Sequence, residues 1–255
     1  MISKNQIKFL NELKQKKSRE EHNLFVAEGH KIISELLGSA IVVKQIYAIP
    51  AAFDKLKIHS NVECIEIKQA ELERISSLVT PNEMLAVCEI PRYTLNISAL
   101  SEKLTLLLDT IKDPGNLGTI IRIADWFGIE TIICSPQSAD AFNPKVIQAT
   151  MGSITRVKIH YTDLSEFVAR NQKETKLPVY GALLEGENLY KQNLPSAAFI
   201  LIGNESRGIS AELIPSISNK ITIPSFSHFK TTPGETESLN AAIATSIICS
   251  EFRRK

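Results

Sequence analysis

The sequence lacks several features that would place the protein in a distinct class. No apolar run approaches the ~20 residues of a membrane span, and residues 1–6 have no apolar core of the kind found in signal peptides. The four cysteines (Cys64, Cys88, Cys134 and Cys249) stand singly in apolar runs, and the five histidines have no metal-ligand spacing. We therefore expect a cytoplasmic protein with buried, reduced cysteines, and without a membrane segment, disulfide or bound metal.

Charge of one sign is also scarce, because the formal net charge is only +1. The whole chain therefore does not have the strong positive charge typical of many nucleic-acid-binding proteins. Local segments differ: residues 1–19 carry six lysines and arginines against Glu12 alone, and residues 253–255 are Arg-Arg-Lys. Such segments can neutralise RNA phosphates, or they can be a solvated helix face and a charged tail. Charge alone leaves both interpretations open.

The pattern of apolar residues predicts an α/β protein with two domains. Residues 1–92 form a smaller α/β domain, 93–103 a linker, and 104–255 a larger domain. In the first, helices are predicted over 5–14, 29–37 and 69–78, and strands over 25–27, 42–49, 62–67 and 84–90. In the second, strands are predicted over 104–109, 130–134, 156–160, 178–183, 198–202 and 220–223, and helices over 117–127, 143–150, 163–173 and 239–252. Strands that alternate with helices indicate a parallel sheet covered on both faces.

Three polar clusters lie at positions where such a domain binds ligands. Asn116-Leu-Gly118-Thr-Ile-Ile-Arg122 and Gly203-Asn-Glu205-Ser-Arg-Gly208 each follow a predicted buried strand, and Ser238-Leu-Asn240 begins the last helix. Ligands of open α/β sheets bind outside the carboxyl ends of the strands. We therefore expect the clusters to form one site.

The order and spacing of these clusters resemble the SpoU/TrmH branch of the SPOUT methyltransferases. The family motifs are Asn-x-Gly-x-x-x-Arg, an apolar strand ending in Gly-x-Glu, and Ile-Pro followed by Ser-Leu-Asn, which match Asn116–Arg122, Gly203–Glu205, Ile223-Pro224 and Ser238–Asn240. The resemblance covers Leu104–Phe252 continuously. It implies a sheet tied into a trefoil knot and a methyl transfer from S-adenosylmethionine to a ribose 2′-hydroxyl of RNA, with ribosomal RNA favoured over transfer RNA.

The resemblance extends more loosely to the N-terminal domain. Phe25-Val-Ala-Glu-Gly29 and Thr80-Pro-Asn-Glu-Met-Leu-Ala-Val87 are similar to the family's substrate-binding domain, an L30e-like α/β fold. The family is also homodimeric through its C-terminal helix. That helix is predicted here to be apolar on more than one face, with Leu239, Ile243, Ile247, Ile248 and Phe252.

Five residues at matching motif positions are the candidate catalytic residues: Arg122, Asn116, Glu205, Ser238 and Asn240. The resemblance gives Arg122 the central role. A guanidinium stays protonated, so we expect Arg122 to grip a phosphate, orient the ribose and stabilise the developing alkoxide, rather than to act as a base. Asn116 can cap its helix as well as act in the site, Glu205 can pair with Arg122 or contact a ligand, and Ser238 can cap the last helix.

The cofactor is expected in an apolar cradle with backbone hydrogen bonds. The resemblance assigns Gly203, Ile223 and Leu239 to it. One departure from the family pattern is an insertion of about Ser225–Pro233 in the loop that should cover the cofactor. It contains Phe226, His228, Phe229 and Lys230, which can form a lid over the cofactor or stack on an RNA base, or lie in an ordinary surface loop.

Two alternatives compete with an S-adenosylmethionine-dependent 2′-O-methyltransferase. The first is a catalytically silent RNA-binding protein of the same fold that acts in ribosome assembly or antibiotic resistance. The candidate residues are retained, which argues against this alternative, while the insertion favours it. The second is a dehydrogenase of nucleotide-binding type, which is disfavoured because the Gly-x-Gly-x-x-Gly pattern and its acidic partner are missing.

Overall fold

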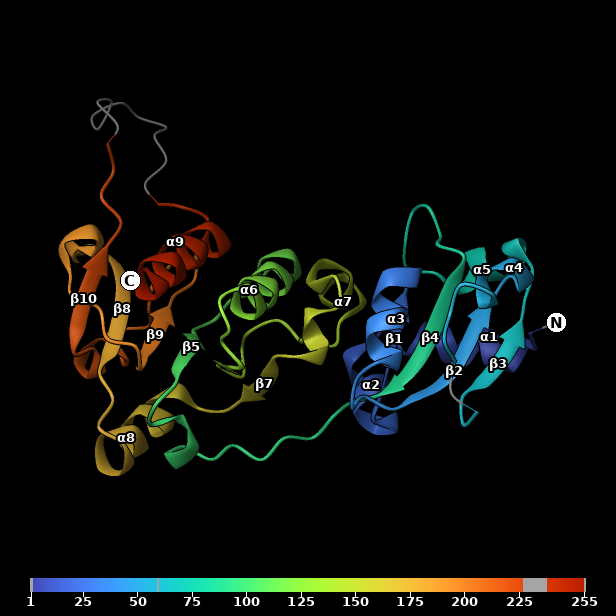
Figure 1. Ribbon diagram of the computed structural model, residues 1–255, viewed down its shortest axis with the longest axis horizontal. Helices are drawn as coiled ribbons and strands as arrows, with labels where there is room; N and C mark the ends of the chain where they lie inside the picture. Colours follow the sequence, from blue (N-terminus) through green and yellow to red (C-terminus); the bar gives the residue numbers. More distant parts are fainter. Residues whose placement is uncertain (1, 59, 227–237, 255) are drawn as a thin grey trace. The chain divides into compact units, whose positions relative to one another are not determined.

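The computed structural model describes residues 2–58, 60–226 and 238–254. The chain divides into two compact units, Met1–Arg92 with Asp140–Arg156, and Tyr93–Ala139 with Val157–Lys255. Each unit is built on its own β-sheet (Figure 1). The units correspond broadly to the predicted halves of the chain, but residues 140–156 belong to the first unit rather than to the second.

The first unit contains a four-stranded mixed sheet in the order β1-β4-β2-β3. Strand β4 pairs antiparallel with β1 and β2, and β3 pairs parallel with β2. The strands are β1 (Leu24–Glu28), β2 (Val43–Ala48), β3 (Glu63–Glu66) and β4 (Met84–Glu89). The helices are α1 (Lys4–Glu12), α2 (Lys16–His22), α3 (His30–Leu37), α4 (Pro50–Phe53), α5 (Gln69–Ile75) and α7 (Pro144–Thr150), with a 3-10 turn, η2 (Ser153–Thr155).

Two short helices of this unit, α2 and α4, were not predicted. Helix α4 has four residues, too few for a period of apolar residues to show. Helix α2 contains only polar and charged residues, but the side chain of one of them, Arg19, is only 1% exposed. The Arg19 guanidinium donates to the carbonyls of Leu13 and Lys14, over 3.0 and 2.8 Å, and to the Asp140 carboxylate. A buried ion pair, rather than an apolar stripe, therefore fixes this helix.

The same ion pair explains why residues 140–156 pack with the first unit. Arg19 of α2 holds Asp140, and the Phe142 ring packs on Phe25 of β1 with the ring centroids 5.0 Å apart. Helix α7 contacts β1 directly. The predicted division was wrong for this segment because the alternation of strands and helices does not tell which sheet a helix covers.

The second unit contains a six-stranded sheet in the order β10-β8-β9-β5-β6-β7, and all its strand pairs are parallel. The predicted parallel sheet is thus confirmed. The strands are β5 (Leu104–Leu108), β6 (Thr131–Cys134), β7 (Lys158–Tyr161), β8 (Val179–Asn188), β9 (Ala198–Ile202) and β10 (Asn219–Thr222). The helices are α6 (Pro114–Trp126), α8 (Leu164–Glu174) and α9 (Ala241–Arg253), with 3-10 turns η1 (Ser98–Leu100), η3 (Leu189–Lys191) and η4 (Ile214–Ser216).

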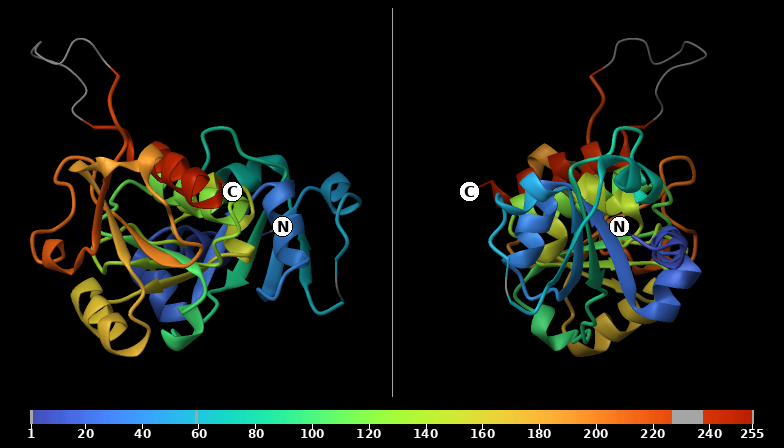
Figure 2. Two further views of the ribbon diagram at one scale, coloured as in Figure 1. Left: turned by 60° about the vertical axis from the view of Figure 1, so that its left-hand side comes forward. Right: turned by 90° about the vertical axis from the view of Figure 1, so that its right-hand side faces the viewer.

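Helices cover both faces of this sheet, with α6 and α9 on one face and α8 on the other (Figure 1). Helices α6 and α9 lie side by side and run in the same direction (Figure 2). At their starts Asn240 donates to Asn116, and at their ends Arg253 Nε donates to the Phe127 carbonyl over 2.8 Å. Because α6 follows β5 directly, both helices begin at the carboxyl edge of the sheet.

The structure corrects two further predictions. The segment 93–103, predicted to be a linker, packs into the second unit, since Ile97 and Leu100 are buried in the core of that unit. Cys64 is exposed, although it was predicted to be buried, because β3 lies at the edge of its sheet. The other three cysteines are buried, and burial raises the pKa of the Cys249 thiol to about 12.

None of the helices described is long and apolar enough to cross a membrane. Within residues 2–58, 60–226 and 238–254, no group of three or more His, Cys, Asp or Glu side chains could hold a metal ion.

Candidate active site

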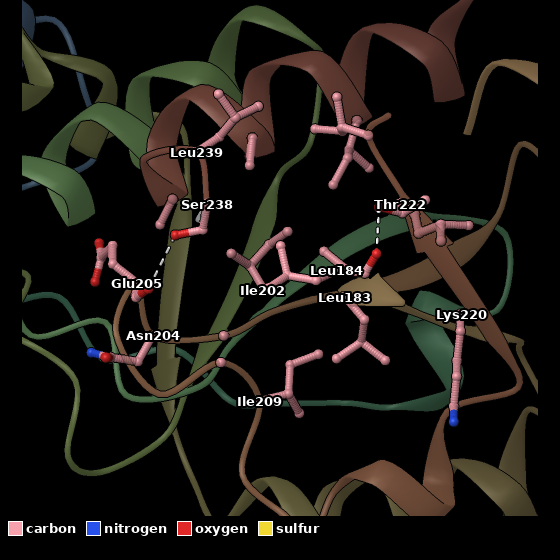
Figure 3. Close-up of a pocket in the computed structure, with 18 of the residues that line it drawn as sticks. Leu183, Leu184, Ile202, Asn204, Glu205, Ile209, Lys220, Thr222, Ser238 and Leu239 are labelled. Atoms are coloured by element: carbon pink, nitrogen blue, oxygen red, sulfur yellow. Dashed lines mark hydrogen bonds between the residues drawn. The ribbon is translucent and has the colours of Figure 1, made fainter. Parts of the chain in front are cut away.

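A cavity of about 560 Å³ opens at the carboxyl ends of β8, β9 and β10, beside the start of α9. Its middle is apolar, and polar side chains lie at its sides, with Asn204, Glu205 and Ser238 at one side and Lys220 and Thr222 at the other (Figure 3). The apolar lining includes Leu183, Leu184, Ile202 and Ile209. Asn204, Glu205 and Ser238 belong to the second and third clusters. The predicted meeting of these clusters at the strand ends therefore occurs.

A chain of hydrogen bonds joins all three clusters beside this cavity. Asn240 Nδ2 donates to Asn116 Oδ1 over 2.9 Å, and Asn116 Nδ2 donates to Glu205 Oε1 over 2.5 Å. Ser238 Oγ donates to the Glu205 backbone carbonyl over 3.4 Å. Four of the five predicted catalytic residues thus form one hydrogen-bonded group.

The helix caps differ from those predicted. Helix α6 begins at Pro114 and is capped by Asp113, whose Oδ1 accepts from the Asn116 backbone N–H over 2.8 Å. Asn116 is therefore not the cap, and its side chain is available to the site. Helix α9 is capped by Asn240, whose Oδ1 accepts from the backbone N–H groups of Ala242 and Ile243 over 3.0 and 3.3 Å. Ser238 lies outside the helix, and so does Leu239, because α9 begins at Ala241.

The turn that carries Glu205 is held in one conformation. Asn204 and Gly208 exchange two backbone hydrogen bonds, of 3.0 and 2.8 Å, and Asn204 Nδ2 donates to the Thr110 carbonyl over 2.9 Å. A Cβ on Gly203 would lie 2.4 Å from the backbone carbon of Gly208, so only glycine fits there. The sequence indicated Gly203, but it gave no role to Asn204.

Asp109 is a second residue that sequence reasoning missed. It ends the predicted strand 104–109, is only 3% exposed, and accepts from the Ser210 backbone N–H over 2.7 Å and from Thr110 Oγ1 over 2.8 Å. It therefore ties the end of β5 to the segment after the Glu205 turn. The sequence signal for this role is a single aspartate at the end of an apolar strand, because a buried carboxylate needs hydrogen-bond partners.

Arg122 stands apart from this group. It is exposed on α6, and it makes no hydrogen bond or ion pair with any residue that the structure describes. The predicted pairing of Arg122 with Glu205 is not found, and Glu205 Oε1 instead accepts from Asn116 Nδ2. One turn along α6, Trp126 is 85% exposed.

The residues predicted to bind the cofactor line the cavity. Gly203, Ile223 and Leu239 all belong to its wall, and the Leu239 side chain is 45% exposed. Most of the insertion, including His228, Phe229 and Lys230, lies outside the described residues, and Phe226 near its start is 80% exposed.

Comparison with family models finds two matches that together span most of the chain. Residues 103–250, more than half of the chain, match the SpoU rRNA Methylase family. Residues 4–86 match the MRM3-like substrate binding domain. The second match falls in the smaller N-terminal part, where the sequence resembled a substrate-binding domain.

Two curated proteins of similar sequence are named as 23S ribosomal RNA methyltransferases. The 23S rRNA (guanosine(2553)-2′-O)-methyltransferase RlmP of Bacillus subtilis is 31% identical over 98% of this chain and 97% of its own length. The 23S rRNA (guanosine-2′-O-)-methyltransferase RlmB of Neisseria meningitidis is 32% identical over 60% of this chain and 58% of its own.

Two solved structures superpose on nearly the whole chain. A putative RNA methyltransferase of the TrmH family from Porphyromonas gingivalis superposes with a TM-score of 0.87 and 38% identity, covering 99% of this chain and 98% of its own. The AdoMet-bound rRNA methyltransferase from Sinorhizobium meliloti superposes with a TM-score of 0.84 and 28% identity, covering 99% and 96%. The chain therefore belongs to the SpoU rRNA methylase family.

Proposed function

We propose that this protein transfers a methyl group from S-adenosylmethionine to a ribose 2′-hydroxyl of ribosomal RNA. The observation that carries the proposal is the cavity at the strand ends, bordered by the hydrogen-bonded group of Asn116, Glu205 and Asn240. Family membership and the 2′-O-methyltransferase names of the relatives support the same reaction.

The cavity suits this cofactor. Its volume, about 560 Å³, is within the range of small-molecule sites, and its apolar middle matches an adenine ring. Gly203 has no side chain and brings backbone to the cavity wall, while Ile223 and Leu239 add apolar surface and backbone groups. The cofactor would be held by these residues, and it supplies a methyl group on a positively charged sulfur. A relative in the same family is AdoMet-bound in its solved structure.

Arg122 has the properties that a phosphate-binding group needs. Its guanidinium is exposed, always charged, and free of partners among the described residues. We assign it to grip the phosphate beside the target ribose and to orient that ribose toward the cavity. Ser238 supports the turn from the cofactor side, through its hydrogen bond to the Glu205 carbonyl.

The RNA class follows from the relatives. Both relatives cited are named for methylation of guanosine in 23S rRNA, and we extend this substrate to the present protein. The first unit is then the part that selects the RNA, in keeping with its family match. We also propose that the protein works in the cytoplasm.

Ribose-methylation mapping of ribosomal and transfer RNA tests this function. Strains with and without the gene should differ at one 23S rRNA guanosine, and the purified protein should restore that mark with radiolabelled S-adenosylmethionine. Calorimetry should show binding of S-adenosylmethionine and none of NAD. Cofactor binding without methylation of any RNA would instead favour the catalytically silent protein.

We also propose that two copies associate through the outer face of α9 and the end of α6. Ile243 is 54% exposed, Leu239 45% and Trp126 85%, whereas Ile248 and Phe252 are buried within the protomer. The apolar surface available for association is therefore smaller than predicted. Light scattering should give a dimer at micromolar concentration, and Ile243→Lys should shift it toward monomer. A wild-type monomer would contradict the proposal.

A further inference from the structure

Methylation of a hydroxyl needs a group that takes up the hydroxyl proton. Of the five candidate side chains, the arginine cannot accept a proton because it stays protonated, and the two asparagines and the serine are far too weak as bases. Glu205 is the one carboxylate among them, and it lines the cavity. The identity of the proton acceptor rests on the proposed function.

The hydrogen bonds around Glu205 have a fixed direction. Backbone N–H groups can only donate, so those of Ala242 and Ile243 require the oxygen of the Asn240 amide on their side. The Asn240 nitrogen must then point to the Asn116 oxygen, and the Asn116 nitrogen to Glu205. The usual ambiguity of asparagine orientation is thereby removed. Every donor in this series of hydrogen bonds points from the start of α9 toward the Glu205 carboxylate.

This direction makes Glu205 a hydrogen-bond acceptor at the oxygen that Asn116 contacts. The start of a helix carries partial positive charge, and the two amides extend it to the carboxylate. The second oxygen, Oε2, has no hydrogen bond to any described residue. Glu205 is partly buried, and its turn is fixed by Asn204, so the free oxygen has a defined position.

We propose that Glu205 Oε2 accepts the proton of the ribose 2′-hydroxyl, and that Asn116 and Asn240 act as its positioning residues. The O–H bond breaks as the proton passes to Oε2, and the ribose oxygen forms the new bond to the methyl carbon. The electrons of the broken C–S bond remain on the sulfur and neutralise its charge. Glu205 then releases its proton to water, so the site returns to its initial state.

Other charged groups lie on the elements around Glu205. Asp113 and Arg122 are on or beside α6, and Arg207 is in the same turn. Charged residues of α9, such as Arg253, lie at its far end. The two arginines stay protonated, so neither can take up the hydroxyl proton.

Glu205→Gln is the decisive variant. Its side-chain carbonyl can still accept from Asn116, but it cannot take up a proton. We expect kcat to fall by at least ~100-fold, the range of lost general-base catalysis. The dissociation constant of S-adenosylmethionine, measured by calorimetry, should change by less than about threefold. Glu212→Gln, which removes an exposed carboxylate outside the site, is the matched control and should behave as wild type.

Chemical rescue separates proton transfer from a purely structural role. Formate, a small carboxylate, should restore part of the turnover of Glu205→Ala and none of the turnover of Arg122→Ala. Turnover of Glu205→Gln within fivefold of wild type would overturn the assignment, and so would a loss of cofactor affinity large enough to account for the lower rate. A wild-type protein that binds the cofactor but methylates no RNA would overturn the proposed function itself, and this step with it.

Discussion

Asn240 has two tasks that substitution can separate. Its oxygen caps α9, and its nitrogen donates to Asn116. Asn240→Asp keeps an oxygen on the helix N–H groups and adds a negative charge, which the start of a helix favours by about 0.3–1 kcal/mol. It removes the donor, however, so Asn116 no longer has a partner that turns its nitrogen toward Glu205. Asn240→Ala removes both tasks.

The two variants should therefore differ in stability and agree in activity. Loss of the cap should lower the free energy of unfolding by about 1 kcal/mol in Asn240→Ala, which lowers Tm by about 2–4 °C for a chain of this size. Asn240→Asp should stay within about 0.5 kcal/mol of wild type, since the gain of charge at the helix start offsets the lost hydrogen bond. Both variants should lose at least ~10-fold in kcat, because Glu205 is no longer held in one orientation.

Differential scanning calorimetry and single-turnover methylation measure the two effects. Thr245→Ser, on the same helix but buried and bonded to the Ala241 carbonyl, is a control for small changes in α9 and should leave turnover unchanged. Full turnover of Asn240→Asp would refute the reasoning, since the donor chain would then be unnecessary. An unchanged Tm of Asn240→Ala would show that the cap contributes nothing to stability.

Four further outcomes are expected. Arg122→Ala should lower kcat/KM by ~10²-fold or more while leaving cofactor affinity within a few-fold, because the guanidinium acts on RNA; near-normal turnover would remove it from the mechanism. Gly203→Ala should weaken S-adenosylmethionine binding at least ~10-fold in calorimetry, because its Cβ would lie 2.4 Å from backbone; unchanged affinity would show that the turn can shift freely. Arg19→Met should destabilise the first unit by about 3 kcal/mol in urea unfolding, because the Asp140 carboxylate and two carbonyls lose their donor; a neutral effect would mean that apolar packing suffices. Of the four cysteines, Cys64 alone should react with a thiol reagent in the native state, and equal reactivity of a second thiol would indicate local opening.

The fold could be predicted from the sequence to a large extent, for a simple reason. Burial on both faces requires apolar strands, and a helix on a sheet requires an apolar face, so the period of the apolar residues reveals the element type. The strands predicted over 104–109 and 198–202 match β5 and β9 within a residue. Errors fall where this signal is weak: in α2, which an ion pair fixes, and at the start of α6, where Asp113 and Pro114 extend the helix before its first apolar residue. The trefoil knot stays a prediction, since it comes from the resemblance alone.

The amino-acid sequence by itself determined which residue types meet at the site, because polar clusters that follow parallel strands are brought to one edge of the sheet. Only the tertiary structure decided how they pair. Asn116 and Glu205 are 89 residues apart, and Asn116 and Asn240 are 124 apart. Whether Glu205 bonds to an asparagine or to Arg122 depends on ångström-scale positions of segments that are distant in the chain. A hydrogen bond is lost within less than an ångström of displacement, whereas an apolar face tolerates such shifts. The sequence pattern therefore decides which segments form helices and strands. The packing of those elements decides which polar side chains form hydrogen bonds with one another.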